Sequence, residues 1–331
     1  MSGVLPLADA IARLRAPDAH EWYSPVAGEP LLAARIEGDA DNDLLALRAL
    51  ASLPAPSIAL AADATAPAAR RWAPRFDVVV ADERALATVS DAIRRAPLAA
   101  ATLAQLLRGA ESRTVEQGLV AESLAYSTLL AGPEFRAWLA SRERTPRVDP
   151  AAAPLHVRRE GELLRLSLAR PARRNAYSAA TRDALVEALA LAACDDSIER
   201  VLLDAEGPAF CAGGDLDEFG LAPDPATAHA VRTTRSAARL VAALADRVEA
   251  RVHGACIGAG IELAAFAGRV VARPDAWFAL PELSMGLLPG AGGTVSLPRR
   301  IGRQHTAWLA FTGARLEAAQ ALAWGLIDAI E

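Results

Sequence analysis

Apolar and polar positions alternate between two patterns in the first part of the chain. Short apolar runs predict three strands, at 31–37, 56–63 and 76–82. Apolar residues at helical spacing predict helices at 41–53, 65–72, 83–95, 97–109, 114–132 and 133–144. Strands that alternate with helices indicate a parallel α/β layer, here followed by a group of helices.

A second unit is predicted after the proline-rich segment TPRVDPAAAP (145–154), which is typical of a linker. It opens with an alternating hairpin at 156–169, followed by an amphipathic helix at 179–195 and a buried strand at 200–207. A further helix is predicted at 226–245. We therefore divide the chain into a region 1–150, which is α/β and helical, and an α/β core at 155–331.

Two glutamates in the core interrupt apolar runs. Glu262 lies in IELAAFAG, a segment that is apolar on every side, and Glu282 lies in FALPELSMGLL. A buried carboxylate is costly unless it is paired, hydrogen-bonded or protonated, and burial raises its pKa. A raised pKa suits a general acid or base near neutral pH. Most acidic side chains are exposed, so two solvent-facing glutamates are the competing interpretation.

Glycines surround both glutamates. Gly254, Gly258 and Gly260 precede the segment of Glu262 and predict a tight turn into a helix N-terminus, where free N–H groups can hold an anion or an oxyanion. Pro289 and Gly290 begin a second glycine loop in which the backbone can approach a ligand closely. A dinucleotide-binding fingerprint is rejected, because Leu263 occupies the position of its third glycine.

Composition narrows the chemistry further. The 331 residues carry a net charge of -5, with 53% apolar and 23% charged residues, which gives no indication of a nucleic-acid surface. Every basic residue among the 35 is arginine, so Schiff-base chemistry on lysine is excluded. The three cysteines are far apart, with no metal-ligand spacing, and fit a reducing cytoplasm. We expect no signal peptide, membrane span, metal or redox cofactor.

Five segments together resemble the crotonase (enoyl-CoA hydratase/isomerase) superfamily. They are RPARRNAYS (170–178), PAFCAGGDLDEF (208–219), HGACIGAGIELA (253–264), FALPELSMGLLPGAGGTVSLPRRIG (278–302) and FTGARLEAAQALAWGLID (311–328). Their order and spacing match, so the resemblance covers about 155–331. It implies an α/β fold with a ββα spiral core, an acyl-CoA thioester substrate that supplies coenzyme A, and no other cofactor.

The resemblance also implies site residues. Backbone N–H groups of Ala212 and Ala259 would form an oxyanion hole, in which preorganised donors stabilise the enolate oxygen. Glu262 would orient and deprotonate water, and Glu282 would protonate the α carbon. Other substrate contacts are expected from residues of three loops: Arg170, Arg173, Arg174, Ala176, Cys211, Gly213, Gly214, Asp215, Pro289 and Gly290. For the three arginines, a solvated basic loop is the alternative to phosphate binding.

The sequence departs from the family pattern in three respects. Ala259 stands where glycine is common, no lysine is available for a phosphate, and the sequence stops at Glu331, where the family normally continues with helices. Those helices cover the acyl pocket and build a homo-oligomer, a trimer or a dimer of trimers. We expect the helices of 97–109 and 114–142 to pack on the core near the loop after Pro289.

Leucines and aromatic residues of these helices should make the contacts: Leu119, Leu129, Leu130, Phe135 and Trp138. Residues 44–85 also resemble a faded copy of 238–276, since both predict helix, strand, turn, helix and strand. Region 1–150 is therefore interpreted as a degenerate crotonase fragment that supplies the covering helices. An unrelated α/β domain is the alternative.

The sequence predicts a cytoplasmic hydratase of 2-enoyl-CoA esters, since both glutamates are present. Two alternatives stay open. The same site could run another thioester-enolate reaction, such as isomerisation or hydrolysis, or the protein could bind acyl-CoA without catalysis.

Overall fold

The N-terminal region forms a parallel sheet of four strands in sequential order. The computed structural model describes residues 3–37, 43–142 and 153–331, and the predicted linker 145–154 lies mostly outside them. The sheet order is β1-β2-β3-β4, with every pair parallel. Its strands are β1 (Leu5–Pro6), β2 (Leu32–Arg35), β3 (Ser57–Leu60) and β4 (Val78–Val80). The three strands expected from the apolar runs are confirmed.

Helices of the N-terminal region begin close to their expected positions. Asp43 accepts hydrogen bonds from the first turn of α3, and Thr114 and Gln117 form a capping box at α7, which fixes these two starts. The helices are α1 (Leu7–Leu14), α2 (Ala19–Trp22), α3 (Leu44–Ser52), α4 (Pro67–Trp72), α5 (Glu83–Arg95), α6 (Pro97–Arg108), α7 (Val115–Leu130) and α8 (Pro133–Ser141), with the 3₁₀ turn η1 (Ala73–Arg75).

The core contains a six-stranded and a three-stranded sheet. The larger has the order β13-β10-β8-β7-β6-β5 and is parallel except for β5, and the smaller has the order β12-β11-β9. The strands of the two core sheets are β5 (Leu155–Glu160), β6 (Leu163–Leu168), β7 (Arg200–Ala205), β8 (Val248–Val252), β9 (Ala255–Ile257), β10 (Arg269–Ala272), β11 (Trp277–Ala279), β12 (Leu316–Glu317) and β13 (Ala329–Ile330). The pairs β8–β9 and β10–β11 each place one strand in each sheet before a helical segment, which is the expected ββα spiral.

Core helices lie between these strands. They are α9 (Ala179–Cys194), α10 (Pro225–Thr234), α11 (Ala237–Ala243), α12 (Ala259–Ala264), α13 (Gly293–Thr312) and α14 (Ala318–Trp324), with the 3₁₀ turns η2 (Pro171–Arg173), η3 (Ala245–Arg247) and η4 (Glu282–Met285). The prediction of a single helix at 226–245 is wrong. The segment forms two helices, α10 and α11, because Ser236 caps the start of the second. Helix α13 also breaks in direction at Gly302, whose φ of 72° and ψ of 161° are non-helical.

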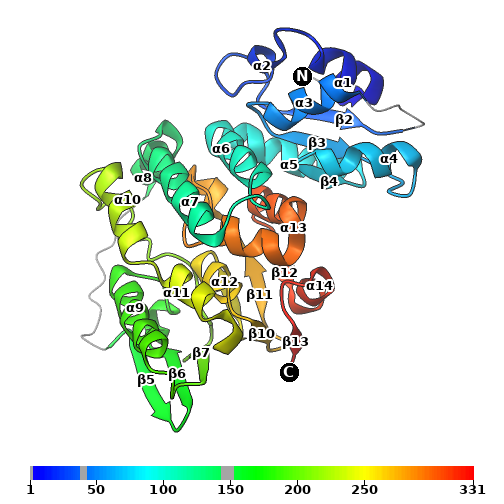
Figure 1. Ribbon diagram of the computed structural model, residues 1–331. Helices are drawn as coiled ribbons and strands as arrows, with labels where there is room; N and C mark the ends of the chain where they lie inside the picture. The colour runs from blue at the N-terminus through cyan, green and yellow to red at the C-terminus, as the bar shows by residue number, and fades with distance from the viewer. Residues whose placement is uncertain (1–2, 38–42, 143–152) are drawn as a thin grey trace.

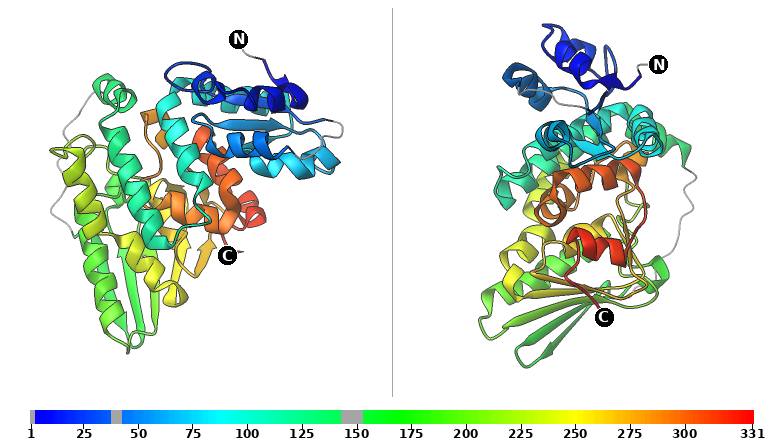
Figure 2. Two further views of the ribbon diagram at one scale, coloured as in Figure 1. Left: turned by 45° about the horizontal axis from the view of Figure 1, so that its top comes forward. Right: turned by 90° about the vertical axis from the view of Figure 1, so that its right-hand side faces the viewer.

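Helices α6, α7 and α8 lie against the core, as expected. α6 and α7 pack on α13, and α7 also runs along α10 (Figures 1 and 2). Leu129 and Phe135 are buried in an apolar cluster that reaches from the N-terminal sheet through these helices into the core, and Leu119, Leu130 and Trp138 pack against it. The two regions therefore share one continuous apolar core, and a separate cluster covers the other face of the N-terminal sheet.

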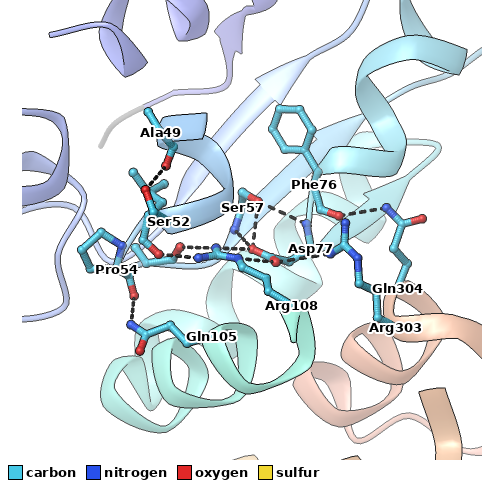
Figure 3. A network of polar contacts seen from close by, with 12 residues as sticks. Ala49, Ser52, Pro54, Ser57, Phe76, Asp77, Gln105, Arg108, Arg303 and Gln304 are labelled. Atoms are coloured by element: carbon cyan, nitrogen blue, oxygen red, sulfur yellow. Dashed lines mark hydrogen bonds and ion pairs between the residues drawn. The ribbon is translucent and has the colours of Figure 1, made fainter. Parts of the chain in front are cut away.

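The N-terminal sheet is joined to the core through a polar network as well. Buried Asp77 precedes β4 and pairs with Arg108 of α6 and Arg303 of α13, with side-chain N–O distances of 2.6 and 3.5 Å (Figure 3). Gln304 donates hydrogen bonds to the carbonyl oxygens of Ala73 and Phe76. The part of α13 after Gly302 thus docks on the N-terminal sheet, while its first residues lie in the core.

The strand and helix order of 44–85 matches that of 238–276 as expected, except that β9 has no counterpart in 44–85. In both segments the two main strands are parallel neighbours, β3 with β4 and β8 with β10. The interpretation of region 1–150 as a degenerate copy of the core stays a prediction.

Candidate active site

Glu262 is placed by a glycine turn and a short buried helix. Gly258 adopts a left-handed φ of +48° between β9 and α12, so the chain reverses within one residue. All six residues of α12 are buried, and Glu262 is only 2% exposed. The expectation of a buried helix with an inward carboxyl is therefore met by the geometry.

The carboxyl of Glu262 is held by the N-terminus of α13. Its Oε2 accepts hydrogen bonds from the N–H groups of Ala291 (2.7 Å) and Gly293 (2.9 Å). A Cβ at position 293 would come within 2.6 Å of Glu262 Cγ, so this approach depends on glycine. Burial raises the pKa of Glu262 to about 7, although the two backbone hydrogen bonds oppose the shift. Glu262 can therefore gain or lose a proton near neutral pH.

Glu282 faces Glu262 across Gly258. A Cβ at position 258 would collide with Glu282 Oε1 and would lie 3.7 Å from Glu262 Oε1. Oε2 of Glu282 is buried and has no hydrogen-bond partner within the described residues. Burial, and then the like charge of Glu262, raises the pKa of Glu282 well above its usual value. Two carboxyl groups in one pocket thus differ in how they are stabilised.

A third buried carboxyl, which the sequence analysis missed, comes from the N-terminal region. Glu122 of α7 is 2% exposed, and its Oε1 accepts from the N–H of Gly292 at 2.7 Å. Its Oε2 accepts from the N–H and the Oγ1 of Thr294, at 2.9 and 2.7 Å. Burial and the neighbouring Glu262 raise its pKa to about 8. The available signal was a glutamate at an apolar position of α7, three residues after Leu119.

Tyr126 and Arg232 complete this wall of the site. The Tyr126 ring lies against Gly290, where a Cβ would collide with it, and burial raises the pKa of its hydroxyl. The Arg232 guanidinium lies 4.9 Å from the centre of that ring. Arg232 also donates hydrogen bonds to Ser123 and Ser127, so α10 is tied to α7 beside the carboxyl groups.

The prediction that Ala212 supplies an oxyanion-hole N–H is wrong, because the backbone of its loop is already paired. The Ala212 N–H donates to the carbonyl oxygen of Arg174 at 3.0 Å, so it has no free hydrogen for a ligand. Gly213, with a φ of +95°, turns the chain, and Tyr177 exchanges backbone hydrogen bonds with Gly213 and Asp215. The N–H of the intervening Gly214 therefore points away from Tyr177 and has no acceptor among the described residues.

Ala259 fits its expected place. It is the first residue of α12, and its N–H has no acceptor in the described parts of the chain. Ala259 and Gly214 both line the same cavity as Glu262 and Glu282. The available pair of backbone donors is therefore Gly214 and Ala259.

The basic loop has a structural role in this conformation. Arg170 and Arg173 both pair with buried Asp215, with N–O distances of 3.0 and 2.9 Å. Arg174 is exposed, and its carbonyl receives the Ala212 N–H. These ion pairs give Arg170 and Arg173 a role in holding the loop, and the expected phosphate contacts of the two arginines stay a prediction.

Only part of the expected substrate-contact set reaches the cavity. Gly213, Gly214 and Gly290 line it. Residues that support the loops from behind, outside the described cavity wall, are Arg170, Arg173, Arg174, Ala176, Cys211, Asp215 and Pro289. The buried Cys211 pairs its backbone with β9, and the Ala176 carbonyl accepts from Arg170. Arginines that do line the cavity were missed: Arg182, Arg232, Arg235 and Arg239.

The cavity has a volume of about 540 Å³ and is bounded by both regions of the chain. Its polar part contains Glu122, Glu262, Glu282, Gly214 and Ala259. An apolar part is formed by Leu119, Val120, Trp138, Leu216, Phe219 and Met285. Trp138 and Phe219 meet edge to face at 6.0 Å between ring centres, so α8 closes the cavity against the loop after Asp215. Such a site can hold an apolar chain beside an acid–base centre.

A ββα spiral that places free backbone amides beside buried carboxyls defines the crotonase class of folds. The enoyl-CoA hydratase/isomerase family model matches residues 158–331, and the chain belongs to this family. The match includes Glu262 and Glu282 but not α7, which carries Glu122. No helix in the described part of the chain has both the length and the apolar character needed to cross a membrane.

Curated relatives carry names of several reactions. The 2,3-dehydroadipyl-CoA hydratase of Escherichia coli K12 is 38% identical over 174 residues, which are 53% of this chain and 68% of that protein. The 1,2-epoxyphenylacetyl-CoA isomerase of the same organism is 37% identical, over 51% of this chain and 66% of that protein. The chain therefore spans about two thirds of the length of these relatives.

Solved structures agree on the fold. An enoyl-CoA hydratase from Mycobacterium smegmatis is 34% identical with a TM-score of 0.50, covering 54% of this chain and 69% of that one. An enoyl-CoA hydratase from Bacillus anthracis is 30% identical, also with a TM-score of 0.50, covering 54% and 70%. Both similarities cover about half of this chain.

Proposed function

We propose that the protein adds water across the double bond of a 2-enoyl-CoA ester, and catalyses the reverse dehydration. The observation that carries this proposal is the pair of buried carboxyl groups, Glu262 and Glu282, on either side of Gly258. Two such groups next to free amide donors supply a base, an acid and an oxyanion site in one cavity. The hydratases among the similar proteins support the same reaction.

Ionised Glu262 would act as the base. Its pKa of about 7 leaves a substantial ionised fraction at neutral pH, so it can accept a proton from water as oxygen bonds to the β carbon. The electron pair of the double bond moves toward the thioester oxygen. Amides of Gly214 and Ala259 would stabilise that charge.

Protonated Glu282 would act as the acid. Its raised pKa keeps the proton on at neutral pH, and this proton would pass to the α carbon as the thioester carbonyl reforms. The water proton on Glu262 then replaces the one that Glu282 has lost. The sum of the steps is one water added, with both carboxyls returned to their starting states.

Coenzyme A would enter as part of the substrate, with the acyl chain in the apolar part of the cavity. Because the protein has no lysine, the phosphates of coenzyme A would contact arginine side chains. Arg182, Arg235 and Arg239 line the cavity, whereas Arg170 and Arg173 lie outside its wall, so the first three are placed better for this contact.

Incubation of the purified protein with crotonyl-CoA tests the proposal. We expect the enoyl absorbance to fall and mass spectrometry to show a product heavier by one water. Glu262→Gln protein is the control and should leave the substrate unchanged. A product of unchanged mass with a shifted double bond would show that the reaction is isomerisation and not hydration. Free coenzyme A would indicate hydrolysis, and no reaction across a panel of enoyl-CoA esters would contradict the proposal.

A further inference from the structure

The N-terminus of α13 binds two carboxyl groups at once. Four successive backbone N–H groups, those of residues 291 to 294, are divided alternately between them. Ala291 and Gly293 donate to Glu262, whereas Gly292 and Thr294 donate to Glu122. The N–H groups and positive dipole end of one helix therefore stabilise both groups, and a change in one carboxyl is felt by the other.

The position of Glu122 is fixed from several sides. Gly118 of α7 lies against Val295, where a Cβ would come within 2.8 Å of the valine side chain. Arg232 bonds to Ser123 and Ser127 on the adjoining turn of α7. Such close packing indicates that α7 is held at one depth, with Glu122 against the catalytic loop.

The charges around Glu122 come from four elements. Glu262 of α12 and Glu282 of η4 carry like charge, and Tyr126 lies one turn further along α7. Arg232 of α10 interacts electrostatically with Glu122, but its hydrogen bonds and ring contact go to serines and Tyr126 rather than to a carboxylate. Within the described residues, Glu122 and Glu262 form no ion pair. The proton shared by this group of carboxyls is therefore not fixed by a paired cation.

We propose that Glu122 is a positioning residue for the reaction, supplied by the N-terminal region to hold the 291–294 loop and to set the ionisation of Glu262. This inference rests on the proposed role of Glu262 as the base. When Glu122 is ionised, its charge disfavours ionisation of Glu262, and when Glu122 is protonated, Glu262 ionises more easily. The first 150 residues thereby take part in the chemistry although they lie outside the family match.

A second glutamate shows what a purely structural contact of this kind is like. Glu134 of α8 accepts hydrogen bonds from the N–H groups of Leu98 and Ala99, at 2.8 and 3.0 Å, at the start of α6. It is only partly buried and lies outside the cavity that contains Glu262. The same substitution at positions 122 and 134 therefore separates an effect on Glu262 from a general loss of a helix contact.

The test compares pH–rate profiles of the full chain with those of Glu122→Gln and Glu134→Gln. When the pair has lost one proton, the charge can lie on either carboxyl, and Glu122→Gln confines it to Glu262. The acidic limb, where Glu262 ionises, should therefore move to lower pH by roughly a few tenths of a unit. Glu134→Gln should keep the parent limb while losing some stability. If the limb of folded Glu122→Gln stays in place, the proposal is wrong.

Thr294→Val is the second variant, because it keeps the carboxyl and decides the question even if Glu122→Gln does not fold. Loss of the Thr294 hydroxyl removes a hydrogen bond that lowers the pKa of Glu122. Glu122 then holds its proton more firmly, so Glu262 should ionise more easily and the limb should move in the same direction by a smaller amount. An unmoved limb in folded Thr294→Val contradicts the proposal.

Thermal unfolding against pH gives a readout that does not need turnover. Glu122 and Glu262 have folded-state pKa values of about 8 and 7, above the unfolded value of about 4.3. Their contribution to stability is complete below the unfolded value and is lost as pH rises through the folded values. Tm should therefore fall between about pH 5 and 8, and less so in Glu122→Gln. If no enoyl-CoA reacts but this difference is found, the proposed function fails, while Glu122 is still shown to titrate inside the folded site, as the inference requires.

Discussion

Two buried carboxyl sites join the N-terminal region to the core, and they are neutralised in opposite ways. Asp77 accepts hydrogen bonds from Ser57 and pairs with the guanidinium groups of Arg108 and Arg303 (Figure 3). Glu122 and Glu262 accept hydrogen bonds from backbone amides and one hydroxyl, and neither forms an ion pair within the described residues. A carboxylate between two arginines has a settled charge, whereas carboxyls held by neutral dipoles can exchange a proton. The contrast fits a structural role for the first site and the proposed catalytic role for the second.

A chain that begins at Pro154 loses the N-terminal half of both sites. It exposes the faces of α10 and α13 that α6 and α7 cover, and an exposed apolar patch of that kind promotes aggregation. We expect the shortened protein to be insoluble or inactive, as judged by size-exclusion chromatography and by hydration of crotonyl-CoA. A monodisperse and fully active protein would show that the N-terminal region is a separate appendage.

Loss of either carboxyl that we propose as catalytic should abolish most turnover and leave the fold intact. Glu262→Gln and Glu282→Gln are each expected to lower kcat by roughly 100- to 10,000-fold, since each removes one acid–base partner. Binding of a CoA ester, measured by calorimetry, should survive. Full activity in either variant contradicts the assigned roles.

The backbone donors can be separated by proline substitution. Gly214→Pro removes an N–H that faces the cavity and should lower the rate by roughly 100- to 1,000-fold. Ala212→Pro is the matched variant, because it removes an N–H that already donates to Arg174 and should cost stability more than rate. Circular dichroism must first show that both are folded, since proline also fixes φ. The reverse order of rate effects would restore Ala212 as the donor.

At the site of Asp77, Arg108 and Arg303, a substitution is expected to affect stability alone. Asp77→Asn leaves Arg108 and Arg303 without their buried partner and should lower the free energy of unfolding by roughly 3–5 kcal/mol, measured in urea. Asp63→Asn is the control, because that carboxylate is exposed and bonds only its own turn at Thr65. A large fall in turnover per folded molecule of Asp77→Asn would mean that the two sites are not separate.

The sequence was sufficient for the features that short segments determine. Periodicity placed three of the four strands of the N-terminal sheet and missed the two-residue β1. The motifs placed Glu262 and Glu282 in one cavity, because each glutamate lies within its own signature. The N–H of Ala259 was also found, since it follows from the start of α12.

Features that depend on pairing between distant segments could not be predicted in this way. Whether Ala212 or Gly214 has the free N–H depends on the segment of Tyr177, which takes up the neighbouring backbone groups. Glu122 meets Glu262 only because α7 packs on α13. The pairing of Arg170 and Arg173 with Asp215 could not be predicted for the same reason, since it is a tertiary contact.

The break at Gly302 has a consequence for how the chain can be engineered. One helix carries the catalytic loop at its first residues and the docking residues Arg303 and Gln304 just beyond the break. The left-handed φ of Gly302 lets each half keep its own direction, yet both halves are one covalent unit. The N-terminal region therefore cannot simply be exchanged for another domain. A fusion of this core to a different N-terminal domain would have to preserve both halves of α13 and a helix that carries Glu122.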